Sequence, residues 1–107
     1  MKTVLFVCSR NRLRSPTAEH LFASHKGIEV ASAGLDPKCG NPVTGELLDW
    51  ADVVFVMERA HRSKLQRRFR AHLGRARLIC LNIPDDYEFM DPALVRLLEA
   101  RVPRFLR

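Results

Sequence analysis

Short apolar runs alternate with stretches of helical periodicity along the chain. Apolar runs typical of strands cover residues 4–7, 28–33, 53–57 and 77–81. Apolar residues three or four positions apart predict helices over residues 16–24, 46–50 and 58–72, and from residue 91 onward. Strands that alternate with helices indicate an α/β fold, in which right-handed crossovers join parallel strands and helices cover both faces of the sheet.

The length of the chain fits a single domain, residues 1–107, with one core. Of its 107 residues, 47% are hydrophobic, which is enough for one core at this size. The apolar run at residues 4–7 is too short for a signal sequence or a membrane span. The three Cys residues are spaced too widely and unevenly for a disulfide framework or a metal site. We therefore expect a cytoplasmic protein with reduced thiols.

The chain is basic, with a formal net charge of +6. This charge favours anionic ligands in general, including phosphorylated side chains, nucleotides, nucleic acid and acidic protein surfaces. The excess concentrates in the basic segment, residues 59–77, which contains Arg62, Lys64, Arg67, Arg68, Arg70 and Arg75. Because charge runs on helices usually face water, we interpret the basic segment as a solvated helix face.

The strongest chemical signal lies between residues 4 and 19. The first strand leads directly to Cys8, and five residues separate Cys8 from Arg14. Ser15 is placed to cap the following helix, and Pro16 suits its first turn. A loop of this length between a strand and a helix N-terminus can turn its backbone N–H groups inward, which makes a site for a tetrahedral oxyanion.

Each residue type in this loop has a separate chemical use. A helix N-terminus and a nearby Arg stabilise a thiolate, so Cys8 is a candidate nucleophile. The planar guanidinium of Arg14 matches two oxygens of a phosphate group. Asn11 tolerates the left-handed backbone that a tight loop often requires. The candidate phosphate-binding residues are Ser9, Arg10, Asn11, Arg12, Leu13 and Arg14.

The motif C-x5-R-S at residues 8–15, followed by Pro-Thr-Ala-Glu, resembles the low-molecular-weight protein tyrosine phosphatases. Residues 32–34 and 51–58 are similar to the second and third strands of that family. The resemblance implies a three-layer domain whose four-stranded parallel sheet has the order 2-1-3-4. It also implies a reaction through a cysteinyl-phosphate, with Cys8, Arg14 and Ser15 as catalytic residues and with no metal or other cofactor. Thioredoxin-coupled arsenate reductases share this scaffold.

The chain departs from the family pattern around the loop. Leu13 stands where relatives often carry a second Cys, Arg10 replaces a usual Gly, and Arg12 replaces a common apolar residue. Fuller relatives also carry a longer segment with an aromatic residue that walls the substrate pocket, whereas residues 36–42 contain no aromatic. The two arginines are either exposed charges or a means of selecting an acidic substrate.

The family resemblance also implies an Asp that protonates the leaving group, and the sequence offers three candidates. Asp85 follows its strand directly and precedes an aromatic residue at position 87. Asp91 lies before a Pro, but helix capping already explains that pair. We therefore predict Asp85, with Asp91 and then Asp86 as alternatives.

Three functions from different classes remain open. The leading hypothesis is a phosphomonoester hydrolase, predicted as a protein tyrosine phosphatase, that acts on a phosphorylated protein or a small phosphate ester. Arsenate reduction needs further accessible thiols, but Cys39 and Cys80 are far apart in sequence and Cys80 is expected in the core. A basic module that binds RNA or another anion lacks recognisable RNA-binding motifs. His20, His25, His61 and His72 are interpreted as surface or interfacial residues without metal-ligand spacing.

Overall fold

The computed structural model describes residues 1–106, and its four strands form one parallel sheet in the order β2-β1-β3-β4. The strands are β1 (Lys2–Cys8), β2 (Ile28–Gly34), β3 (Val53–Val56) and β4 (Arg77–Cys80). The helices are α1 (Arg14–Phe22), α2 (Gly45–Trp50), α3 (Arg59–Arg68) and α4 (Pro92–Arg101), with 3-10 turns at Arg70–His72 and Pro103–Phe105. The predicted fold class and strand order are confirmed.

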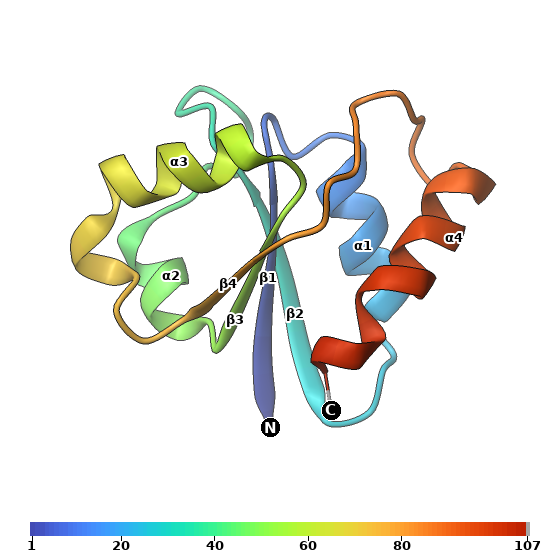
Figure 1. The fold of residues 1–107 in the computed structure, drawn as a ribbon, viewed down its shortest axis with the longest axis horizontal. Coiled ribbons are helices and arrows are strands. Elements are labelled where there is room, and N and C mark those ends of the chain that lie inside the picture. The colour runs from blue at the N-terminus through green and yellow to red at the C-terminus, as the bar shows by residue number, and fades with distance from the viewer. Residues whose placement is uncertain (107) are drawn as a thin grey trace.

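Helices cover the two faces of the sheet in pairs. Figure 1 shows α1 and α4 on one side and α2 and α3 on the other. Alternate residues of β1 serve the two layers, because Phe6 belongs to the core on the α1 side and Leu5 to the core on the α2 side. The ring of Phe6 stacks on that of Phe55 with centroids 5.2 Å apart. Burial on both faces accounts for the near-continuous apolar character of the central strands.

Two helix boundaries differ from the prediction. Helix α1 begins at Arg14 and has Leu13 at its N-cap without a side-chain hydrogen bond, so the prediction that Ser15 caps this helix is wrong. The Ser15 hydroxyl instead bonds to Cys8 and Asn11. Helix α3 ends at Arg68, because Phe69 leaves the helical conformation and packs partly buried against the α2-side core.

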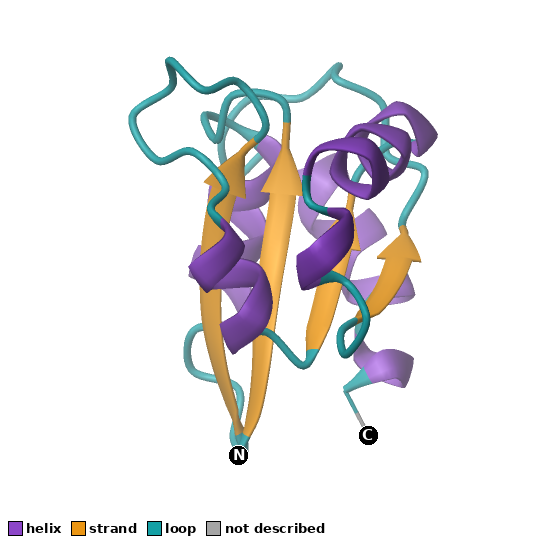
Figure 2. Ribbon diagram, turned by 90° about the vertical axis from the view of Figure 1, so that its left-hand side faces the viewer, coloured by secondary structure: helices purple, strands orange, loops and turns teal. Residues whose placement is uncertain are grey.

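All four strands point the same way, so their carboxyl ends meet at one edge of the sheet, at the top in Figure 2. The loop after β1 and the segment after β4 both leave this edge. The opposite edge carries the chain ends, where Lys2 Nζ donates to the carbonyl oxygen of Phe105 at 3.4 Å. Within residues 1–106, no helix combines the length and the apolar character needed to cross a bilayer.

A polar junction joins the beginnings of β1 and β3. The Thr3 amide donates to Asp52 Oδ2 at 3.0 Å, and the Asp52 amide donates to the Thr3 hydroxyl at 2.9 Å. Arg75 Nη2 lies 2.9 Å from Asp52 Oδ1. These bonds, with the Thr3 amide first and Arg75 second, lower the pKa of Asp52 from 3.8 to about 2. The ionised carboxylate therefore stabilises the fold.

We expect Asp52→Asn to lower the melting temperature at pH 7. Because the folded pKa is below the unfolded one, this contribution is complete above about pH 4 and is lost as the pH falls through about 2. Circular dichroism melts between pH 7 and pH 2 should show the difference from the natural chain shrinking over that range. Asp86→Asn, at an exposed carboxylate, is the control. A difference that stays constant down to pH 2 would contradict this account.

Candidate active site

The Cys8 loop, residues 8–14, turns tightly between β1 and α1. Asn11 has a φ of 56° in this loop, the left-handed conformation that its residue type predicted. Gly34 on β2 lies directly beside the turn, because a Cβ atom there would be 2.8 Å from the carbonyl carbon of Arg10 and 2.9 Å from the Asn11 amide nitrogen. The absence of a side chain at Gly34 therefore lets the Cys8 loop pack against the end of β2.

Cys8, Asn11 and Ser15 form a short hydrogen-bonded chain inside the loop. Cys8 Sγ lies 2.9 Å from Ser15 Oγ, and Asn11 Nδ2 donates to the same hydroxyl oxygen at 2.9 Å. Cys8 and Ser15 are both buried. Since the Ser15 oxygen accepts the bond from Asn11, its own hydrogen can be donated to the sulfur.

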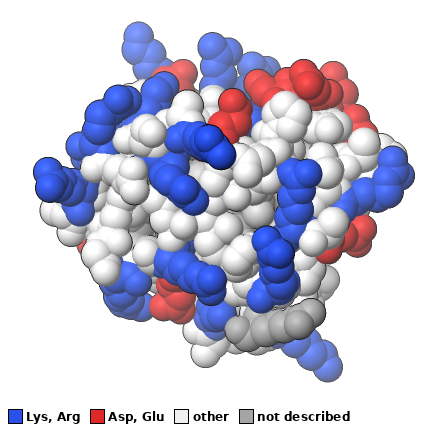
Figure 3. Space-filling view, in the orientation of Figure 1, with Lys and Arg blue, Asp and Glu red and all other residues white. Residues whose placement is uncertain are grey.

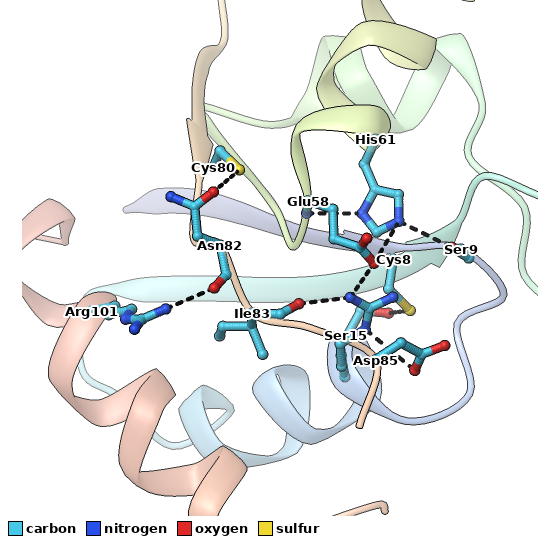
Figure 4. Close-up of polar contacts among 11 residues, drawn as sticks. Cys8, Ser9, Ser15, Glu58, His61, Cys80, Asn82, Ile83, Asp85 and Arg101 are labelled. Atoms are coloured by element: carbon cyan, nitrogen blue, oxygen red, sulfur yellow. Dashed lines mark hydrogen bonds and ion pairs between the residues drawn. The ribbon is translucent and has the colours of Figure 1, made fainter. Parts of the chain in front are cut away.

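Arg14 is a buried cation whose side chain is 2% exposed. Its Nη1 donates to Glu58 Oε2 at 2.6 Å and to the carbonyl oxygen of Ile83 at 2.7 Å, and its Nε lies 3.7 Å from Asp85 Oδ1. Figure 4 shows these partners converging from the end of β3 and from the segment after β4. The guanidinium thus joins the start of α1 to two other segments of the chain that are distant in sequence.

His61 is buried beside the Cys8 loop, so its interpretation as a surface or interfacial residue is wrong. The Glu58 amide donates to His61 Nδ1 at 3.2 Å, and His61 Nε2 lies 3.0 Å from Ser9 Oγ. A neutral imidazole that accepts at Nδ1 carries its proton on Nε2, which then donates to the Ser9 hydroxyl. Burial lowers the pKa of His61 from 6.5, and the charge of Arg14 adds to the effect.

Hydrogen bonds hold the β4–α4 loop, residues 81–91, near both of its ends. Arg101 of α4 donates to the carbonyl oxygen of Asn82 at 2.9 Å (Figure 4). The Met90 amide donates to the hydroxyl of Thr17 in α1 at 2.9 Å. These bonds hold Asp85, the predicted acid, in the middle of a loop that lies over the N-terminal end of α1.

A pocket of about 610 Å³ opens at this edge of the sheet, and we call it the Cys8 pocket. Its lining combines the carboxylates of Asp85 and Glu88 with three arginines of the Cys8 loop. The partly buried Tyr87 packs against the α1-side core, and none of the described residues that line the pocket is aromatic. The lining residues are Cys8, Ser9, Arg10, Arg12, Leu13, Arg14, Asp85 and Glu88.

The other two candidate acids lie outside this lining. Asp91 caps α4, with its Oδ1 accepting from the Ala93 amide at 2.8 Å, and Asp86 is exposed. The structure adds Glu58 and His61, which the sequence analysis did not select. Both follow β3, and the expectation that ligands bind beyond the carboxyl ends of parallel strands could have indicated them. No group of three or more His, Cys, Asp or Glu side chains within residues 1–106 is arranged to hold a metal ion.

Comparison of the sequence with known proteins points to a single phosphatase family. A sequence model described as low molecular weight phosphotyrosine protein phosphatase matches residues 3–49, which include the Cys8 loop. EpsP of Ralstonia solanacearum, a probable low molecular weight protein-tyrosine-phosphatase, is 30% identical over 98 residues, covering 69% of this chain and 68% of that protein. The chain belongs to the low molecular weight protein-tyrosine-phosphatase family. The predicted membership is confirmed, and the protein is accordingly an enzyme.

Solved structures share the fold of this phosphatase-family chain. The low molecular weight protein tyrosine phosphatase SP-PTP of Streptococcus pyogenes superposes with a TM-score of 0.80 at 18% identity, covering 100% of this chain and 95% of that chain. The YwlE arginine phosphatase of Geobacillus stearothermophilus superposes with a TM-score of 0.78 at 22% identity, covering 99% and 93%. At these identities the matches establish the common fold.

The buried neutral His61 should make folding stability depend on pH. The unfolded chain protonates this imidazole more readily than the folded chain does, so the free energy of unfolding should fall as the pH drops below about 6.5. Glu58, which favours the protonated form, reduces the effect without reversing it. Urea denaturation at pH 7.5 and 5.5 should show a smaller pH effect in His61→Gln than in the natural chain. His20→Gln, at an exposed position, should retain the natural pH effect, and an equal change in both variants would contradict the assignment.

Proposed function

We propose that the protein hydrolyses phosphate monoesters on proteins through a cysteinyl-phosphate formed at Cys8. The observation that carries the proposal is the meeting of three groups in one pocket: the Cys8 sulfur, the Arg14 guanidinium and the Asp85 carboxylate. These are the nucleophile, the oxyanion-binding group and the proton donor that the reaction requires.

The first half of the proposed reaction transfers the phosphoryl group to sulfur. The Cys8 thiolate attacks the phosphorus, and the bond between phosphorus and the ester oxygen breaks. That oxygen takes its proton from Asp85. The hydrogen bond from Ser15 and the backbone amides at the start of α1 favour the negatively charged sulfur before the attack.

The second half regenerates the enzyme. Asp85, now ionised, accepts a proton from water as the water oxygen attacks the phosphorus, and the phosphorus–sulfur bond breaks with its electron pair returning to Cys8. Inorganic phosphate then leaves. Arg14 and the loop amides would hold the three equatorial oxygens through both steps, since a fixed guanidinium stabilises charge without reorganising.

The substrate class follows from the relatives and from the pocket lining. The curated relatives are named as probable protein-tyrosine-phosphatases, and a structural neighbour is named as an arginine phosphatase. We propose a phosphorylated protein, with phosphotyrosine as the first substrate to test. Within residues 1–106, no aromatic side chain lines the Cys8 pocket to pack against a tyrosyl ring, so the charged residues of the pocket lining contribute more of the binding. The reduced thiol that catalysis needs fits a cytoplasmic location.

The two alternative functions have less support. Arsenate reduction needs a relay of thiols that reach Cys8. Cys39 lies outside the Cys8 loop, next to Gly34, whereas the Cys80 thiol interacts with Asn82 at 3.4 Å on the end of β4. Neither of these cysteines lines the Cys8 pocket. An RNA-binding role would explain the basic residues but not the hydrogen bonds that link Cys8, Ser15 and Asn11.

Cys8→Ser should abolish hydrolysis of p-nitrophenyl phosphate, with a loss on the order of 10⁴-fold or more in kcat, because the serine hydroxyl is a far weaker nucleophile at neutral pH. Release of p-nitrophenol measures the rate. Cys80→Ser, at a position outside the pocket, should keep the activity. Activity that survives in Cys8→Ser would exclude the cysteinyl-phosphate mechanism.

Asp85→Asn should lower kcat on phosphotyrosine by about 10²- to 10⁴-fold, because the leaving oxygen loses its proton donor. The loss should be smaller on p-nitrophenyl phosphate, whose leaving group needs less protonation. Asp91→Asn is a matched control, since Asn also caps helices well and should preserve both α4 and the rate. The assignment fails if Asp91→Asn causes the larger loss.

A further inference from the structure

A second hollow adjoins the Cys8 pocket on the α3 side and has a volume of about 570 Å³. We call it the basic hollow. Its walls come from the Cys8 loop, the segment after β2 and one face of α3. The two hollows share Ser9 and Arg10, so a ligand could occupy both at once. The lining residues of the basic hollow are Ser9, Arg10, Leu35, Asp36, Pro37, Lys64, Arg67 and Arg68.

Helical geometry brings three basic residues of α3 to this wall. Lys64, Arg67 and Arg68 are three and four positions apart, so their side chains share one face of the helix. The neighbouring stripe of His61 and Leu65 is buried, which fixes the rotation of α3. The interpretation of the basic segment as a solvated face therefore applies only in part.

Arg68 joins the α3 wall of the basic hollow to the opposite wall, which the segment after β2 forms. Its Nη1 donates to the carbonyl oxygen of Leu35 at 2.6 Å, which joins α3 to the segment after β2. The backbone of that segment is tied in turn to the Cys8 loop, since the Asp36 amide donates to the carbonyl oxygen of Ser9 at 2.8 Å. The walls of the hollow are thus fixed relative to Cys8.

The charges in the hollow are mostly positive and mostly unpaired. Among the described lining residues, four are basic and one, Asp36, is acidic. The Asp36 carboxylate accepts a hydrogen bond from the Lys38 amide at 2.9 Å. Within the described part of the chain, no carboxylate forms an ion pair with Arg10, Lys64 or Arg67. A concave surface lined with unpaired cations concentrates anions.

The common opening of the Cys8 pocket and the basic hollow therefore carries positive charge on one side and negative charge on the other. In Figure 3, basic side chains dominate the upper left, over α3, and acidic side chains gather at the upper right, over the β4–α4 loop. Asp85 and Glu88 lie in the Cys8 pocket on the acidic side. A ligand that is anionic along its whole length is attracted by the basic side of this opening but repelled by the carboxylates on the acidic side. A protein segment whose negative charge is concentrated next to its phosphate can place that charge on the basic side and its uncharged part on the acidic side.

We infer that the basic hollow binds an acidic side chain next to the phosphorylated residue of a protein substrate. This inference rests on the proposed function and names the substrates that the enzyme prefers. A protein segment is favoured over nucleic acid because none of the described residues lining the two hollows is an aromatic that could stack on a base. The exposed Pro37 supplies apolar surface for the stem of a Glu side chain.

The test compares phosphotyrosine peptides that differ only in the two residues on one side of the phosphotyrosine. Each side in turn carries Glu-Glu, Gln-Gln or Lys-Lys, and the readout is the ratio of kcat/KM between the acidic and the neutral peptide. We expect a ratio of about 5 to 10 for one side, as two partly solvated ion pairs typically contribute. In the double variant Lys64→Ala, Arg67→Ala the ratio should fall to about 1.

The control variant is Arg70→Ala, which removes an exposed charge from the same basic segment outside the hollow. It should retain the ratio. Because a ratio is insensitive to the fraction of active enzyme, partial misfolding of a variant does not imitate the expected result. The inference is overturned if the ratio is near 1 for both sides, or if a preference survives in the double variant.

Two further measurements separate this inference from the proposed function. Binding of the fluorescent acidic peptide to Cys8→Ser, followed by anisotropy, should weaken when Lys64 and Arg67 are replaced in that background, and this holds whether or not the enzyme hydrolyses p-nitrophenyl phosphate. A 5′-phosphorylated oligothymidylate serves as the competing ligand. If only the oligonucleotide depends on Lys64 and Arg67, the occupant is nucleic acid and the inference is wrong.

Discussion

The buried guanidinium of Arg14 is the constraint on which the site depends. A charge that is 2% exposed is stable only with close partners, and the chain supplies the Glu58 carboxylate and the Ile83 carbonyl oxygen. These partners lie after β3 and after β4, while Arg14 opens α1. The requirement to satisfy one cation therefore fixes three separate segments at the same edge of the sheet and prepares the pocket before any ligand arrives.

Much of this could be predicted because the decisive residues are contiguous. The strand, the Cys8 loop and the start of α1 lie within residues 2–22, so local patterns predicted the candidate nucleophile. The alternation of strands and helices along the chain predicted the fold class, and the family resemblance implied the strand order. Glu58 and His61 escaped prediction because their roles exist only through long-range contacts with Arg14 and Ser9. The sequence does not reveal which turn of a later helix faces a loop some fifty positions earlier.

Ser15 and the basic segment illustrate how a residue can be placed correctly while its surroundings are predicted wrongly. Ser15 was expected at the helix cap, but α1 begins one residue earlier and its hydroxyl serves the Cys8 loop instead. The basic segment was expected in solvent, but its charges have different surroundings: Lys64 and Arg67 of α3 line a hollow, whereas Arg75, in the turn before β4, pairs with Asp52. A run of like charges indicates exposure, but the rotation of α3 and the path of the chain after it decide what each charge faces.

The parallel sheet also separates the reactive edge from the chain ends. Lys2 and Phe105 are hydrogen-bonded at the foot of the sheet, and Met1 is 83% exposed there. A linker attached to the N-terminus would therefore hold the protein at the edge of the sheet opposite the Cys8 pocket and leave the pocket facing bulk solution. Tethering at this end suits bead-based capture of phosphorylated proteins and single-molecule work, because the solid support cannot shield the opening.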